Sequence, residues 1–127
     1  MAHTVELTAE NFETIVDTQG IVLLDWWAEW CAPCRAFGPV FEAAAAKHPD
    51  VVFAKVDTEA QPQLATAFEI RSIPTLMILR DGVLLYAQPG MVPAAALEQL
   101  IAKVRALDMS QVRAELSKRD QPRAQAS

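Results

Sequence analysis

Residues 25–35 of the chain read Asp25-Trp26-Trp27-Ala28-Glu29-Trp30-Cys31-Ala32-Pro33-Cys34-Arg35. The segment continues an apolar run that begins at Ile21, and such a run is typical of a central strand covered on both faces. The pattern that follows predicts a helix from Cys31 or Ala32 to Lys47. The two cysteines of the chain therefore lie where a buried strand gives way to a helix.

The two cysteines are placed for thiol–disulfide exchange, which needs one thiolate to attack and a second thiol to resolve the mixed disulfide. A helix N-terminus offers unpaired backbone N–H groups and the positive end of the helix dipole, and both stabilise a thiolate. Such settings lower the pKa of a cysteine from about 8.5 into a range of roughly 3.5–7.5. We therefore expect Cys31 to be the solvent-exposed nucleophile and Cys34, one turn further in, the resolving thiol. The alternative is an incidental pair of core cysteines.

Metal binding is the other chemistry that a close cysteine pair suggests. A zinc site needs about four ligands, and the only histidines are His3 and His48, which lie far apart in the sequence. The chain has no second cysteine pair. A reducing cytosol disfavours structural disulfides. The pair is therefore interpreted as redox-active, with no metal and no cofactor.

Length and charge limit the classes of partner. The chain has 127 residues, a natural size for one domain, and its hydrophobic content of 52% allows a proper core. Residues 1–109 hold 7 Lys and Arg against 14 Asp and Glu, whereas residues 110–127 hold 4 against 2. An acidic body argues against nucleic-acid binding. No apolar run is long enough for a membrane, and the N-terminus does not resemble a signal peptide, so a cytoplasmic protein is expected.

Strand-like and helix-like patterns alternate along most of the chain. Strands are predicted at residues 3–7, 21–28, 51–56, 75–80 and 83–88, the last two joined by a tight hairpin at Asp81-Gly82. Helices are predicted at residues 9–18, at 31–47, after a cap at Asp57 or Thr58, and from Pro93 to about Leu107. This order predicts an α/β fold, with a mixed sheet covered by helices on both faces.

The last residues break this pattern. Val112 and Leu116 extend the helical spacing by a couple of turns, but residues 117–127 carry no large apolar side chain. We therefore expect one domain at residues 1–109 and a C-terminal extension at residues 110–127. The extension is predicted to be partly helical and then disordered from Ser117.

Four features together resemble the thioredoxin family: residues 25–35, the run Ile73-Pro74-Thr75, the Asp81-Gly82 hairpin, and Gly90 after the last strand. The resemblance covers about residues 3–107. It implies a thioredoxin fold, in which four helices flank a central five-stranded sheet of order 1-3-2-4-5. It also implies reduction of disulfides in substrate proteins, with NADPH-dependent thioredoxin reductase regenerating the dithiol. A monomer is expected.

One departure from the family pattern lies between the cysteines. Thioredoxins usually carry Gly-Pro there, whereas this chain has Ala32-Pro33. Oxidising and isomerising relatives tend to place a histidine in that dipeptide, so its absence favours a reductase. Arg35 replaces the more usual lysine and keeps a positive charge beside the site.

Two charged residues in predicted strands are candidates for the catalytic machinery. Asp25 is the only polar residue from Ile21 to Ala28, and burial of a lone carboxylate is costly unless it is protonated or partnered. The resemblance implies that Asp25 accepts the proton of Cys34 and that Lys55 tunes Asp25 electrostatically. The alternatives are a carboxylate on an exposed face and a lysine that reaches for solvent.

The remaining candidates form an implied surface for substrates. A cis bond before Pro74, implied by the resemblance, would turn the Ile73 backbone towards the cysteines, where a substrate segment could pair by strand addition. Without the resemblance, Pro74 marks only the start of an edge strand, and Gly90 is a plain loop glycine. Trp27 is assigned to the core. The predicted substrate-binding residues are Trp30, Ala32, Pro33, Ile73, Pro74 and Gly90.

Three functions compete. The first is a general protein-disulfide reductase. The second is an oxidase or isomerase of the same fold, which the absence of a secretion signal and of a histidine between the cysteines both disfavour. The third is a binding module that uses the fold as an adaptor or co-chaperone. The basic tail is its best support, whereas the intact Cys31, Cys34, Asp25 and Pro74 count against it.

Overall fold

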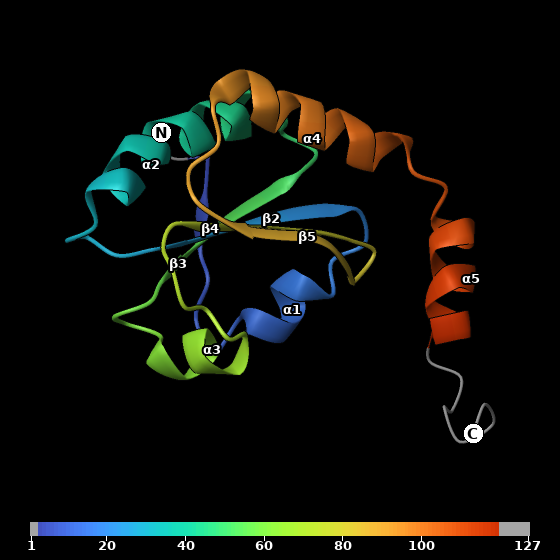
Figure 1. The fold of residues 1–127 in the computed structure, drawn as a ribbon, viewed down its shortest axis with the longest axis horizontal. Coiled ribbons are helices and arrows are strands. Elements are labelled where there is room, and N and C mark those ends of the chain that lie inside the picture. Colours follow the sequence, from blue (N-terminus) through green and yellow to red (C-terminus); the bar gives the residue numbers. More distant parts are fainter. Residues whose placement is uncertain (1–2, 120–127) are drawn as a thin grey trace.

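The computed structural model describes residues 3–119 and has a five-stranded sheet at its centre. The strand order is β1-β3-β2-β4-β5 (Figure 1). β2 and β1 both run parallel to β3, β4 runs antiparallel to β2, and β5 runs antiparallel to β4. This topology confirms the predicted thioredoxin fold. The strands are β1 (Val5–Glu6), β2 (Ile21–Trp27), β3 (Val52–Asp57), β4 (Thr75–Arg80) and β5 (Val83–Pro89).

Helices cover both faces of the sheet, with α2 and α4 on one side and α1 and α3 on the other (Figure 1). A fifth helix, α5, stands beyond the end of α4, on the opposite side of the molecule from the start of α2. The helices are α1 (Phe12–Val16), α2 (Ala32–Lys47), α3 (Pro62–Ala67), α4 (Ala94–Ala106) and α5 (Met109–Arg119).

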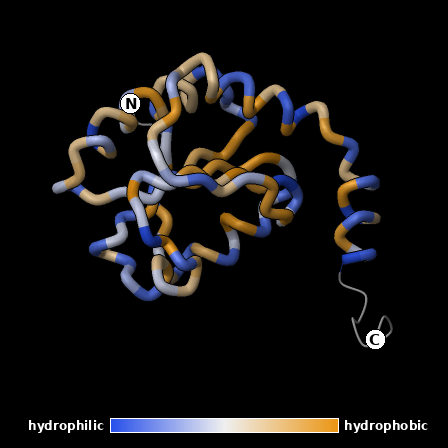
Figure 2. The backbone as a smooth tube through the Cα atoms, viewed as in Figure 1, coloured by the Kyte–Doolittle hydropathy of each residue, from blue (hydrophilic) through white to orange (hydrophobic). Residues whose placement is uncertain are grey.

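The sheet separates two hydrophobic cores, because successive strand residues point to opposite faces. Leu23 of β2 packs with Phe41 of α2 on one face, whereas Leu24 and Trp26 pack on the other. Both faces of β2 are therefore buried, which explains why its sequence is a continuous apolar run and not an alternating one. In Figure 2 the hydrophobic colour concentrates on the central strands.

Two helices begin later than predicted. α1 starts at Phe12 and not at Ala9, because the Thr8 N–H donates to Asn11 Oδ1 (2.7 Å) in a turn that precedes the helix. α3 starts at Pro62, because Asp57 Oδ1 accepts the N–H groups of Glu59 and Ala60 in a separate turn. The side chain of Asp57 thus accepts hydrogen bonds from the loop before α3, and the residue that caps α3 is Gln61.

The predicted hairpin between β4 and β5 is confirmed. Asp81 and Gly82 have φ values of 53° and 78°, and two positive φ values in succession define the turn type that suits two antiparallel strands. The hairpin is also tied to the loop before β2. The Gly20 N–H donates to Asp81 Oδ1 (2.8 Å), and the Asp81 N–H donates to the Gly20 carbonyl (2.9 Å).

The C-terminal extension contains a longer helix than predicted. α5 runs to Arg119, so the expectation of disorder is wrong for residues 117–119, while residues 120–127 lie outside the described residues. Asp108 Oδ1 accepts from the N–H of Ser110 and initiates the helix, and Met109 is buried. Val112 and Leu116 line a groove of about 390 Å³ against β5. The boundary at residue 109 stays a prediction.

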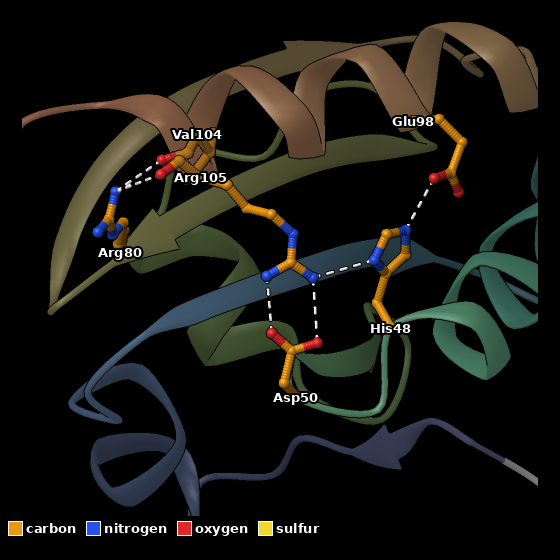
Figure 3. A network of polar contacts seen from close by, with 6 residues as sticks. All are labelled: His48, Asp50, Arg80, Glu98, Val104 and Arg105. Carbon is orange, nitrogen blue, oxygen red and sulfur yellow. Dashed lines mark hydrogen bonds and ion pairs between the residues drawn. The ribbon is translucent and has the colours of Figure 1, made fainter.

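A polar network ties the end of α2 to α4 (Figure 3). The Arg105 guanidinium donates to both carboxylate oxygens of Asp50 (2.7 and 3.0 Å) and to His48 Nδ1 (3.0 Å). Since arginine only donates, His48 Nε2 carries the proton and donates to Glu98 (2.8 Å). We call these four residues the His48 network. Beside it, Arg80 donates to the carbonyls of Val104 and Leu107 and fixes the turn before α5.

Within the part of the chain that the structure describes, the helices are all too short or too polar to cross a membrane.

Candidate active site

The two cysteines meet at the start of α2, as predicted. Cys31 is the residue before the helix, and its sulfur accepts the backbone N–H of Cys34 (3.2 Å). The Cα atoms lie 5.2 Å apart and the sulfurs are joined in a disulfide. Pro33 occupies the first turn, where its missing N–H leaves no hydrogen bond unmade. The Cys31 sulfur thus accepts a hydrogen bond from one of the backbone N–H groups that have no partner within the helix.

Both sulfurs are shielded in this disulfide form. Cys31 is only 4% exposed and Cys34 only 2%, so the expectation that Cys31 is solvent-exposed is wrong for this state. The covering residue is Ile73, whose carbonyl oxygen lies 3.7 Å from the Cys31 sulfur and whose side chain packs against the pair. Trp27 is partly buried and packs on the same cluster, in agreement with its predicted packing against the active-site loop.

The Ile73–Pro74 bond is cis, as the family resemblance implied. Pro74 is buried, and its carbonyl accepts the Gly90 N–H (2.8 Å). Gly90 has φ of 99°, which a residue with a side chain rarely adopts, and the space where a Cβ would stand is open. Ile73 therefore lies beside Cys31, with Pro74 and Gly90 joined next to it, although all three are distant from the cysteine in the sequence.

Asp25 is fully buried, so the alternative of an exposed carboxylate is wrong. Neither of its carboxylate oxygens has a hydrogen-bond partner among residues 3–119. Burial raises the pKa of Asp25 from 3.8 to about 7, even though the positive charge of Lys55 opposes the shift. Asp25 alternates with Leu23 along β2, which places it on the sheet face that α2 covers.

Lys55 is the strand neighbour of Asp25 in the β2–β3 ladder. The side chain is half-buried, and its Nζ lies 4.6 Å from the centroid of the Trp27 ring, within the range of a cation–π contact. It also approaches α2 at Gly38, where an added Cβ would stand 3.7 Å from Nζ. The lysine therefore lies between the sheet and the active-site helix instead of extending into solvent.

The contacts of Lys55 with Trp27 and Gly38 escaped sequence reasoning. The sequence offered no signal for them, because packing does not require a glycine at position 38, where an added Cβ would stand at an ordinary contact distance from the Lys55 Nζ. Trp27 was assigned to the core without a partner. The residue packs against the cysteine cluster and its ring lies under the Lys55 Nζ, so it contacts both parts of the site.

The outer surface of the site is apolar and exposed. Trp30 is 67% exposed, and Ala32 and Pro33 are also exposed. An indole that stays in water beside a reactive disulfide is a suitable contact surface for another protein. Within residues 3–119, no group of three or more His, Cys, Asp or Glu side chains could hold a metal ion.

Comparison with known proteins agrees with this geometry. The thioredoxin family model matches residues 3–103. A protein of Streptomyces coelicolor provisionally named thioredoxin 2 is 60% identical over 113 residues, which cover 89% of this chain and 84% of that protein. The thioredoxin of Chlamydia trachomatis is 39% identical over 97 residues, covering 76% of this chain and 94% of the relative.

Among solved structures, a mutant thioredoxin of Halobacterium salinarum superposes with a TM-score of 0.76 at 28% identity, covering 83% of this chain and 93% of that chain. The family model and both relatives match most of the chain, and the chain carries the cysteine pair at disulfide distance. The chain therefore belongs to the thioredoxin family and is a thiol–disulfide oxidoreductase.

Proposed function

We propose that the protein reduces disulfides in other proteins, with Cys31 as the attacking thiolate and Cys34 as the resolving thiol. The observation that carries this assignment is the position of Cys31 before α2, where its sulfur accepts the Cys34 N–H. That N–H and the helix dipole favour negative charge on the Cys31 sulfur in the reduced protein.

The reaction transfers two electrons to the substrate. The Cys31 thiolate attacks one sulfur of the substrate disulfide, that S–S bond breaks, and a mixed disulfide forms with release of one substrate thiolate. Cys34 then loses its proton and attacks the Cys31 sulfur. The mixed disulfide breaks, the second substrate thiolate leaves and takes up a proton, and the protein is left in the disulfide form described above.

Asp25 is assigned the role of proton acceptor for Cys34. A general base works best when its pKa lies near the working pH, and burial raises the pKa of Asp25 to about 7. Its carboxylate has no competing partner among the described residues, and it lies on the sheet face beneath α2. Lys55 limits the rise in pKa through its positive charge, and Trp27 holds the lysine in place.

Substrates are assigned to the surface formed by Trp30, Ala32, Pro33, Ile73, Pro74 and Gly90. The backbone at Ile73 lies beside the Cys31 sulfur, which supports pairing of an extended substrate segment at this point. The family implies thioredoxin reductase as the source of electrons, and we propose that an NADPH-dependent reductase of this kind regenerates the dithiol.

A coupled assay tests this function. Insulin is mixed with catalytic amounts of the protein, thioredoxin reductase and NADPH, and the oxidation of NADPH is followed. We expect many turnovers per protein molecule for the wild type and none for Cys31→Ser. Absence of catalysis by a correctly folded wild type, with the Cys31–Cys34 pair reduced beforehand, would point instead to an adaptor. An equilibrium with glutathione that favours the protein dithiol would point to an oxidase.

A further inference from the structure

The exposed indole of Trp30 lines one wall of a groove next to the active site. The groove has a volume of about 380 Å³, and its other lining residues are Glu29, Asp57 and Glu59. Trp30 directly precedes the reactive Cys31 in the chain. The groove therefore borders the residue next to the reactive cysteine.

Two of the three carboxylates are free to receive a cation. Glu29 and Glu59 are exposed, and among residues 3–119 neither carboxylate takes part in an ion pair or hydrogen bond. The nearby Arg35 guanidinium donates to the backbone carbonyl of Glu29 (3.1 Å). Asp57 differs, because its carboxylate holds the turn at Glu59 and Ala60 through two accepted N–H groups.

We propose that this groove selects substrate proteins that carry a lysine or arginine close to the target disulfide. The aliphatic stem of such a residue packs on the Trp30 ring, its charged end lies over the ring face, and the carboxylates of Glu29 and Glu59 pair with it. The inference rests on the proposed function, since the same groove borders the sulfur that attacks the substrate. It adds a charge preference to a contact surface that is otherwise apolar.

Charge complementarity at an exposed rim acts mainly on the rate of encounter and is weakened by salt. The preference is therefore expected in the second-order rate constant for substrate reduction, not in the chemistry of the sulfurs. Isolated exposed ion pairs have small effects. We accordingly expect a preference of about fivefold at low ionic strength and little preference in roughly 0.5 M salt.

The test uses two cyclic disulfide peptides that differ only in the two residues flanking one cysteine, which are lysine in one and glutamate in the other. The full-length reduced protein is mixed with each peptide in stopped flow. Each rate constant is divided by that of dithiothreitol with the same peptide, which removes the effect of the flanking charges on the peptide disulfide itself. The comparison is made for the wild type, for the double variant Glu29→Gln/Glu59→Gln, and for the control variant Asp17→Asn/Glu115→Gln.

Asp17 and Glu115 are exposed, and they lie beyond the N-terminal end of β2 and on α5, away from the groove. The control therefore loses the same net charge without changing the groove. We expect the wild type and the control to prefer the lysine peptide about fivefold, and the double variant to lose this preference. Equal normalised rates in the wild type, or a preference that survives in the double variant, would overturn the proposed selectivity alone. Failure to reduce either peptide would overturn the proposed function as well.

Discussion

The molecule contains two groups of charged residues that differ in burial, in hydrogen bonding and in the direction in which the pKa of the carboxylate is shifted. Asp25 is fully buried, has no hydrogen-bond partner among residues 3–119, and faces one cation, Lys55, across the strand ladder. The His48 network lies at the other end of α2 and is partly exposed, with Asp50 held by two hydrogen bonds from Arg105 (Figure 3).

The two carboxylates are consequently shifted in opposite directions. Burial raises the pKa of Asp25 to about 7, whereas the hydrogen bond from Arg105 lowers the pKa of Asp50 to about 2. A surface carboxylate with hydrogen-bond partners stabilises the folded state slightly, whereas a buried carboxylate without partners destabilises it. The destabilising carboxylate of Asp25 therefore lies on the sheet face under the cysteine-bearing helix, where the proposed reaction uses a base.

The largest expected effect separates the two cysteines. Cys34→Ser should accumulate covalent adducts with substrate proteins, because the mixed disulfide forms at Cys31 and cannot be resolved. Cys31→Ser should give few adducts, and both variants should lose insulin reduction by about a thousandfold or more. Adducts are counted on a non-reducing gel and should disappear when reductant is added.

The same roles predict the order of alkylation in the reduced wild type, where iodoacetamide should label Cys31 before Cys34. Arg105→Gln serves as the control, because it disrupts the His48 network at the opposite end of α2 and should leave the trapping pattern unchanged. Faster labelling of Cys34, or better trapping by Cys31→Ser, would reverse the assigned roles.

Asp25→Asn should slow disulfide exchange by about tenfold or more, because the amide cannot accept the Cys34 proton. The same change should stabilise the fold, because the amide carries no buried charge. The unfolded Asp25 titrates near 3.8 and the folded one near 7, so the folded protein binds the extra proton between these values. Wild-type stability should therefore fall from about pH 4 to pH 7, by roughly 4 kcal/mol in total. Denaturant unfolding of the oxidised proteins at several pH values measures this difference.

Asp50→Asn is the matched control for this prediction, since it makes the same chemical change in the His48 network. It should alter neither the exchange rate nor the decline in stability between pH 4 and 7. If Asp25→Asn showed an unchanged exchange rate and the same pH dependence as the wild type, the buried-base assignment would be wrong.

Local patterns in the sequence were sufficient to predict the strand and the helix that carry the cysteine pair. The apolar run of β2 and the cysteine spacing predicted a strand followed by a helix, because both signals lie within a few neighbouring residues. The burial of Cys31 was not predictable in this way, because Ile73, which covers it, comes from a loop 42 residues further along the chain. The Lys55–Trp27 contact was missed for the same reason.

The end of the chain shows a different limit of sequence reasoning. Residues 117–119 lack apolar side chains, yet they are helical because α5 is already initiated at Asp108 and anchored by Met109. A helix that has been nucleated extends at little cost through residues that would not start one. Composition alone therefore underestimates the length of such a helix.

Deletion of the extension should have a moderate effect. A chain ending at Leu107 loses the buried Met109 side chain, and we expect it to be less stable by about 1–3 kcal/mol with unchanged insulin reduction. A chain ending at Arg119 should match the full-length protein in both respects. Loss of activity in the shorter chain would connect α5 to the active site, and an unchanged melting temperature would show that Met109 does not anchor the extension.

The smallest expected effect is on stability and concerns Asp50. Asp50→Asn should destabilise the fold, whereas Asp25→Asn should stabilise it. Because Arg105 lowers the pKa of Asp50 to about 2 in the folded protein, its contribution to stability is present above pH 3.8 and is lost as the pH falls through 2. The pair is exposed, so Asp50→Asn should lower the melting temperature at pH 7 by only a few degrees. The difference should shrink in 1 M salt, which screens exposed charges. A double-mutant cycle with Arg105→Gln isolates the pair, and a coupling that salt did not reduce would mean that the network acts through packing instead of charge.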